Sequence, residues 1–72
     1  MPGGTPERVT VNLAGRAVPA LERAMALTGD SKTDTINRAV QVYAFAVEAM
    51  RNGGAVYVRP AKDAELERVR IF

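Results

Sequence analysis

The stretch Arg8-Val9-Thr10-Val11-Asn12-Leu13 alternates strictly between polar and apolar side chains. Period-two alternation with β-branched residues predicts a half-buried β-strand, with apolar side chains on one face and polar side chains on the other. A strand this short is not stable without a partner strand, and the rest of the chain offers none close by. The polar face carries Arg8, Thr10 and Asn12, whose side chains can all hydrogen-bond to the edge of a base.

The length and composition favour an obligate dimer. The chain has 72 residues, which is near the size where the core of a monomer is marginal, and 47% of them are hydrophobic. A small alanine-rich helical bundle is one explanation of this surplus of apolar residues. We favour a dimer that buries the surplus at its interface, so that folding and association are one event. The net charge of +2 permits binding to nucleic acid without arguing strongly for it.

Several function classes are excluded by the residues that the sequence lacks. There is no Cys and no His, which excludes disulfides, thiolate or imidazole metal sites and nucleophilic chemistry based on either residue. Asp30 and Asp34 are explained by helix capping, so we expect no enzymatic activity, metal or cofactor. No apolar run approaches the length of a membrane span, and the N-terminus lacks the regions of a signal peptide. The expectation is therefore a cytoplasmic protein without a membrane contact.

Two helices are predicted after the strand. Residues 1–7 contain two prolines and two glycines and are expected to form a flexible leader. Apolar residues spaced by three and four predict a helix over residues 17–28, with Pro19 in its first turn and Gly29 after its end. A second helix is predicted over residues 32–52, with Ser31 as N-cap and Gly53-Gly54 after its end. The second helix is apolar on most sides, so a second subunit is the natural cover for the face that the first helix leaves free.

The C-terminal residues 55–72 are predicted to form a β-hairpin or an extended tail. Residues 55–59 alternate as a short strand, and residues 60–64 resemble a turn. Residues 66–72 are ambiguous between a strand and a short helix.

The strand, the two helices and the turn between them together resemble the ribbon-helix-helix family of DNA-binding proteins, of the methionine-repressor and Arc-repressor type. The resemblance covers residues 8–52, within an expected domain of residues 8–54. It rests on R-V-T-V-N-L, Leu21, Gly29-Asp30-Ser31, Ile36 and Ala39-Val40 at their joint spacing. The implied fold class is mainly α with a short N-terminal strand over residues 8–13. Two copies would form a homodimer whose strands pair as an intermolecular antiparallel ribbon, followed by the C-terminal hairpin or tail.

The resemblance also implies site residues. The outward strand residues Arg8, Thr10 and Asn12 are expected to contact bases in the major groove. The start of the second helix, with Ser31, Lys32 and Thr33, is expected to contact a backbone phosphate, because free N–H groups and the helix dipole make an anion site. Arginines 16, 23, 38 and 51 are expected to be solvated helix charges. The expected dimer core consists of Val9, Val11, Leu13, Leu21, Ile36, Val40, Tyr43 and Val47.

The leading hypothesis is a homodimeric, sequence-specific protein that binds double-stranded DNA, most simply a transcriptional repressor, with higher assembly on DNA left open. One alternative is an antitoxin whose C-terminal segment binds and neutralises a toxin. Another is a dimerisation module without a nucleic-acid role. The anchors of the antitoxin alternative would be Val56, Tyr57, Val58, Leu66, Val69, Ile71 and Phe72.

Overall fold

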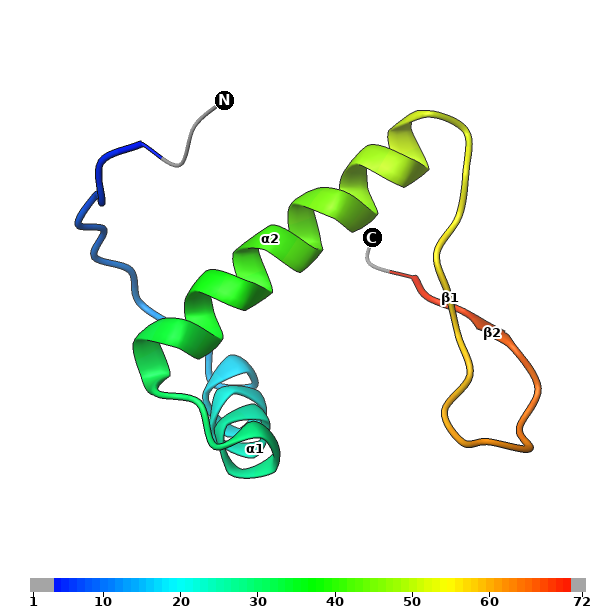
Figure 1. The fold of residues 1–72 in the computed structure, drawn as a ribbon, viewed down its shortest axis with the longest axis horizontal. Coiled ribbons are helices and arrows are strands. Elements are labelled where there is room, and N and C mark those ends of the chain that lie inside the picture. Colours follow the sequence, from blue (N-terminus) through cyan, green and yellow to red (C-terminus); the bar gives the residue numbers. More distant parts are fainter. Residues whose placement is uncertain (1–3, 71–72) are drawn as a thin grey trace.

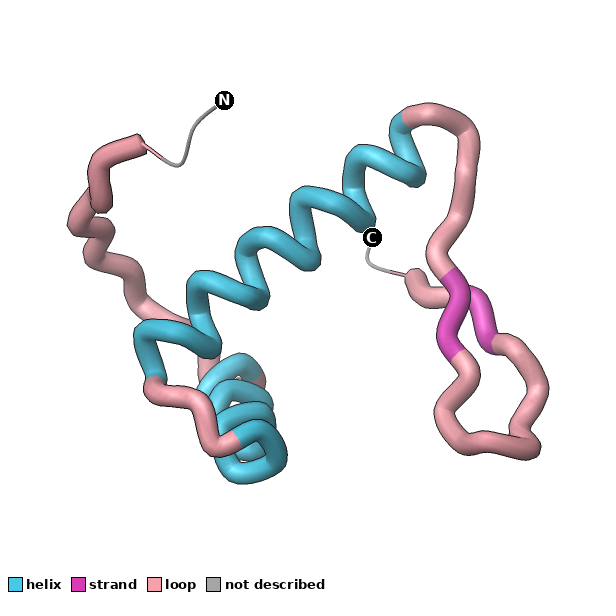
Figure 2. The backbone as a smooth tube through the Cα atoms, viewed as in Figure 1, coloured by secondary structure: helices cyan, strands magenta, loops and turns pink. Residues whose placement is uncertain are grey.

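The computed structural model describes residues 4–70 and contains two helices followed by a small sheet. Helix α1 spans Ala17–Thr28 and helix α2 spans Lys32–Arg51, while strands β1 (Tyr57–Val58) and β2 (Glu67–Arg68) pair at the C-terminal end (Figures 1 and 2). The mainly α fold class with a C-terminal hairpin is therefore confirmed. Of the predicted leader, residues 1–3 lie outside the described residues, and so do residues 71–72 of the tail.

The predicted N-terminal strand is absent from the single chain. Residues 8–13 form a loop, and the strands that do form are C-terminal. The physical reason is that a strand exists only where its backbone N–H and C=O groups meet those of a partner. In the part of the chain that the structure describes, the only paired strands are β1 and β2.

Helix α1 has the bounds that its apolar spacing predicts. Pro19 is its third residue, where the missing N–H lies in the first turn and removes no helical hydrogen bond. The carbonyl of Ala14 accepts the N–H groups of Ala17 and Val18 at 2.8 and 3.3 Å. At the other end Gly29 has φ 78° and donates its N–H to the carbonyl of Met25 at 2.8 Å. Glycine adopts this left-handed conformation without steric cost, so the helix ends here.

Helix α2 begins where the sequence predicts and ends one residue earlier. The Oγ of Ser31 accepts the N–H of Asp34 at 3.1 Å, as expected of an N-cap. Asn52, predicted as the last helical residue, is instead the C-cap, with φ −86° and ψ 14°. The N–H groups of Gly53 and Gly54 then return to the carbonyls of Met50 and Ala49 at 3.2 and 2.9 Å. These bonds satisfy carbonyls that the helix end leaves free.

The C-terminal segment is a β-hairpin. Strands β1 and β2 are antiparallel, with Tyr57 opposite Arg68 and Val58 opposite Glu67. One further bond extends the pairing, because the N–H of Val69 donates to the carbonyl of Val56 at 2.8 Å. Of the alternatives for residues 66–72, the strand is thus confirmed over Glu67–Arg68, and the hairpin is confirmed over the extended tail.

The single chain has almost no buried core. Among the described residues, Ala46 is the only buried hydrophobic residue, at 4% exposure. The packed face of α1 against α2 is only half-buried, as Leu21, Ala24 and Met25 show. Large apolar side chains remain open along α2, including Val40 at 62% and Phe45 at 71% exposure. Burial of apolar surface is the main favourable contribution to folding. A single chain that leaves so much of this surface exposed therefore has little to stabilise its fold.

Neither described helix is long and apolar enough to cross a membrane.

The turn after α2 has no room for a side chain at Gly54, which leads to a prediction about stability. A Cβ on Gly54 would lie 2.9 Å from the carbonyl oxygen of Ala49, which real Cβ atoms essentially never do. We expect Gly54→Ala to lower the free energy of unfolding by about 1–3 kcal/mol, because backbone must move to relieve the contact. Gly15→Ala is the control, since a Cβ there meets nothing within 4 Å. Urea unfolding of both variants checks the prediction, and equal stabilities would contradict it.

Candidate nucleic-acid interface

The three predicted base-contacting residues lie on the loop that precedes α1. Arg8, Thr10 and Asn12 are all exposed, and within residues 4–70 none of their side chains makes a hydrogen bond or an ion pair. The apolar residues between them are also uncovered, with Val9 at 68% and Val11 at 62% exposure. The segment therefore has both its polar and its apolar side chains available for contact with another molecule.

The first turn of α2 presents free N–H groups, as predicted for a phosphate contact. The N–H of Asp34 is taken by the Ser31 hydroxyl at 3.1 Å, and that of Thr35 by the Ser31 carbonyl at 2.9 Å. The N–H groups of Lys32 and Thr33 have no partner in the described part of the chain. Both side chains are exposed. Free N–H groups at the positive end of a helix dipole, beside a lysine, attract an anion.

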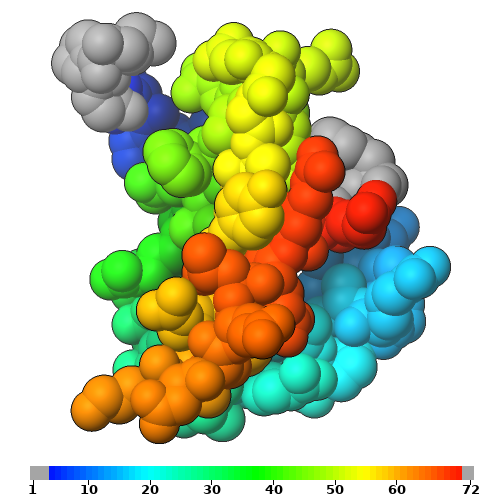
Figure 3. All heavy atoms as spheres, turned by 90° about the vertical axis from the view of Figure 1, so that its right-hand side faces the viewer, coloured from blue at the N-terminus to red at the C-terminus, as the bar shows by residue number. Residues whose placement is uncertain are grey.

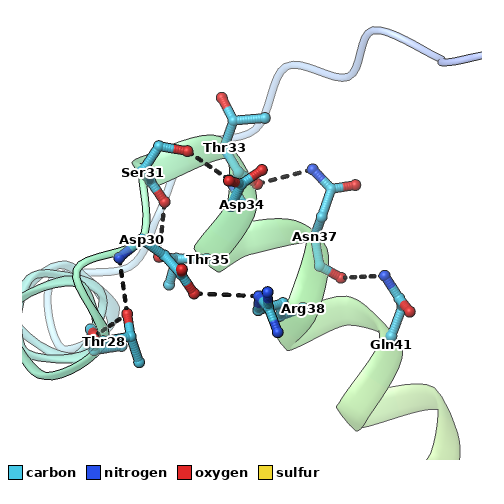
Figure 4. Close-up of polar contacts among 10 residues, drawn as sticks. Thr28, Asp30, Ser31, Thr33, Asp34, Thr35, Asn37, Arg38 and Gln41 are labelled. Carbon is cyan, nitrogen blue, oxygen red and sulfur yellow. Dashed lines mark hydrogen bonds and ion pairs between the residues drawn. The ribbon is translucent and has the colours of Figure 1, made fainter.

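Polar side chains hold this turn in place (Figure 4). Thr35 is buried, and its hydroxyl donates to the Ser31 carbonyl at 2.8 Å. One turn further, the amide of Asn37 donates to the Thr33 carbonyl at 2.8 Å. The hydroxyl of Thr28 accepts the N–H of Asp30 at 3.1 Å and donates to the carbonyl of Ala24 at 2.9 Å. Several short-range bonds therefore hold the connection between the helices at the start of α2.

An ion pair beside this turn was not foreseen. The Nε of Arg38 lies 3.2 Å from the Oδ2 of Asp30 (Figure 4). Arg38 is a solvated helix charge, as expected, with its side chain 73% exposed. The partner was not predicted, because the turn between the helices brings Asp30 back over the first turns of α2. The spacing of eight residues across a capped turn is the signal that could have indicated it. Arg38 balances the negative charge that Asp30 would otherwise place next to the free N–H groups.

The two predicted DNA-contacting sets lie at the same end of the molecule. In Figure 1 the loop before α1 and the first turn of α2 are both near one end of the longest axis. The hairpin lies near the other end. Base-reading and phosphate-binding groups must face the same duplex, so this arrangement is compatible with one binding surface.

The predicted dimer core is not buried within one chain. Leu21 and Val47 are half-buried, and the other six residues are exposed. The exposed members are Val9, Val11, Leu13, Ile36, Val40 and Tyr43.

Comparison of the chain with protein-family models, curated proteins and solved structures finds no match. Over residues 4–70, no three His, Cys, Asp or Glu side chains gather as a candidate metal site.

Proposed function

We propose that two copies of this chain pair through residues 8–13 and that the dimer binds double-stranded DNA sequence-specifically, as a transcriptional repressor does. The observation that carries the proposal is that this segment alternates polar and apolar side chains and that all of them are exposed. Its apolar side chains lack a cover and its backbone lacks a partner strand among residues 4–70. A second copy supplies the partner strand and the apolar cover at once. Antiparallel pairing about a two-fold axis places the apolar faces of both strands on the same side of the ribbon.

The dimer buries the surface that a single chain leaves open. Pairing turns Val9, Val11 and Leu13 of both chains onto the helices. The exposed α2 residues Val40 and Tyr43 then have a partner helix to pack against. Apolar surface of this extent on a small protein is typical of an interaction site.

The same pairing places the polar residues on the outside. Arg8, Thr10 and Asn12 of both chains then form the exposed face of a two-stranded ribbon, which fits the major groove of B-DNA. The free N–H groups of Lys32 and Thr33 receive a backbone phosphate and set the register on the duplex. Phosphate contacts supply most of the affinity, and the ribbon side chains supply the choice of sequence.

The antitoxin alternative has weaker support. It needs a C-terminal segment that is free to wrap around a partner protein. Strands β1 and β2 in this segment are paired as a hairpin, and Val56 and Val69 beside them are half-buried. The proposal therefore assigns the hairpin to the fold of the domain.

The deciding experiment measures binding to DNA from upstream of the protein's own gene and to a random duplex, across a salt series. We expect the wild type to prefer the upstream DNA and to lose affinity as salt rises. The triple variant Arg8→Ala/Thr10→Ala/Asn12→Ala should lose that preference, at about 1–3 kcal/mol of discrimination for each good base contact.

The control is Arg23→Ala, which removes the same charge as Arg8→Ala from an exposed position on α1. It should keep the preference for upstream DNA. If the triple variant still discriminated between the duplexes, the strand would not be the reading surface. If no protein bound DNA at low salt, the dimerisation module would be the better description.

A further inference from the structure

A hollow lies where the end of α2 meets the hairpin, and three arginines line it. Arg51 is the last residue of α2, and Arg68 and Arg70 come from β2 and the residues after it. The rest of the lining is small or apolar, with Gly54 and Val69 among it. Figure 3 shows this side of the molecule, with the segment after β2 beside the segment before β1.

The hairpin brings two arginines to the end of α2, and among the described residues no acidic one lines the hollow. Arg68 stands opposite Tyr57 in the hairpin, and Arg70 follows it by two residues. Both line the hollow together with Val69 between them. Glu67 stands opposite Val58 and does not line the hollow. None of the three acidic residues that follow Arg51 in the sequence lines the hollow.

The three guanidinium groups are not neutralised by the protein. Over the described residues the only ion pair is that between Arg38 and Asp30. The negative end of the α2 dipole accounts for Arg51, which lies in the last turn. It does not account for Arg68 and Arg70, because N–H groups of residues 52–54 already occupy the carbonyls of Glu48, Ala49 and Met50. Like charges gathered in one hollow repel one another and are stabilised by an anion.

We propose that this hollow binds a small molecule that carries a phosphate or diphosphate group. The planar guanidinium forks of arginine match phosphate oxygens in pairs, and a charge-assisted bond of this kind is stronger than a neutral one. The apolar part of the lining suits the organic part of a phosphate ester better than it suits further charged groups.

The position in the fold favours a small ligand over the DNA backbone. Helix α2 has 20 residues and is therefore about 30 Å long. The hollow lies at its C-terminal end, whereas the proposed phosphate contact with DNA lies at its N-terminal end. The argument from position rests on the proposed function. The charges and the lining of the hollow are independent of it.

The test is a titration of the full chain with inorganic diphosphate, without DNA and at constant ionic strength, followed by calorimetry and by amide NMR shifts. We expect saturable binding with shifts at Gly54 and Val69. The variant Arg68→Gln/Arg70→Gln should weaken binding by about a hundredfold, roughly tenfold for each charged hydrogen-bond donor. Arg51→Gln changes the helix rather than the hairpin and should weaken diphosphate binding about tenfold. This variant replaces the double variant in the test if the double variant unfolds.

The matched control is Arg59→Gln/Lys62→Gln. It removes two positive charges from the same hairpin at exposed positions outside the hollow, and should bind diphosphate like the wild type. Equal losses in both double variants, or binding that does not saturate, would overturn the proposal. So would a loss of duplex affinity in Arg68→Gln/Arg70→Gln as large as that in the strand variant, since the hollow would then contact DNA. If the chain bound diphosphate but no DNA, only the proposed function would fail.

Discussion

Val11→Asp is expected to dissociate the dimer and, with it, to unfold most of the chain. In the proposed ribbon Val11 lies at the middle of the apolar face, and each dimer contains two copies of it. An unpaired carboxylate in such a place costs about 3–5 kcal/mol for each copy. The dissociation constant should therefore rise at least about a thousandfold. Since one chain buries a single hydrophobic residue among those described, loss of the partner leaves little to keep it folded.

Thr10→Asp is the control for this effect. It introduces the same charge at the neighbouring residue, which the ribbon turns toward solvent. Sedimentation equilibrium should find this variant dimeric and Val11→Asp monomeric at the same concentration, and circular dichroism should show retained helix only in the former. The unfolding midpoint of the wild type should also rise with protein concentration. If the two variants dissociated equally, or if the wild type were a monomer, the pairing through residues 8–13 would be wrong.

Ala46→Leu should lower the free energy of unfolding by about 1–3 kcal/mol, because the side chain has no room to grow. Ala46 is 4% exposed, and within residues 4–70 it is the one hydrophobic side chain that a single chain already buries. The extra carbons must displace neighbours or shift α2. For a domain of this size each kcal/mol lowers the melting temperature by roughly 4–8 °C.

The control is Ala44→Leu on the same helix, where the side chain is exposed. Alanine and leucine have similar helix propensity, so the two variants differ in burial rather than in backbone preference. Calorimetry should find Ala44→Leu close to the wild type. Equal melting temperatures for both variants would mean that the covering of Ala46 does not contribute to the fold in solution.

The helices were predictable because their signals are local. Pro19 in a first turn, Ser31 at an N-cap and Gly29 after a C-terminus act through the backbone of a few neighbouring residues. The strand over residues 8–13 was predicted from equally local alternation, yet the single chain does not form it. Alternation reports which faces a strand would have, whereas the strand itself needs hydrogen bonds from a partner.

The candidate site likewise has a part that local sequence signals predict and a part that depends on the tertiary structure. The free N–H groups at the start of α2 were predictable from the Ser31 cap, because a cap determines which N–H groups stay free. The ion pair between Asp30 and Arg38 was missed, because it depends on how the turn returns the chain over α2.

The sequence left open whether residues 55–72 form a hairpin or an extended tail, and the two faces of residues 8–13 stay a prediction. By itself it determined the bounds of α1, the start of α2 and, to within one residue, the end of α2. These properties depend on interactions between residues close along the chain. The tertiary structure alone decided that Arg51, Arg68 and Arg70 share one hollow and that Ala46 is covered while Val40 and Tyr43 are not. Such neighbourhoods are set by the register of β1 against β2 and the packing of α1 on α2, which join residues far apart in the sequence.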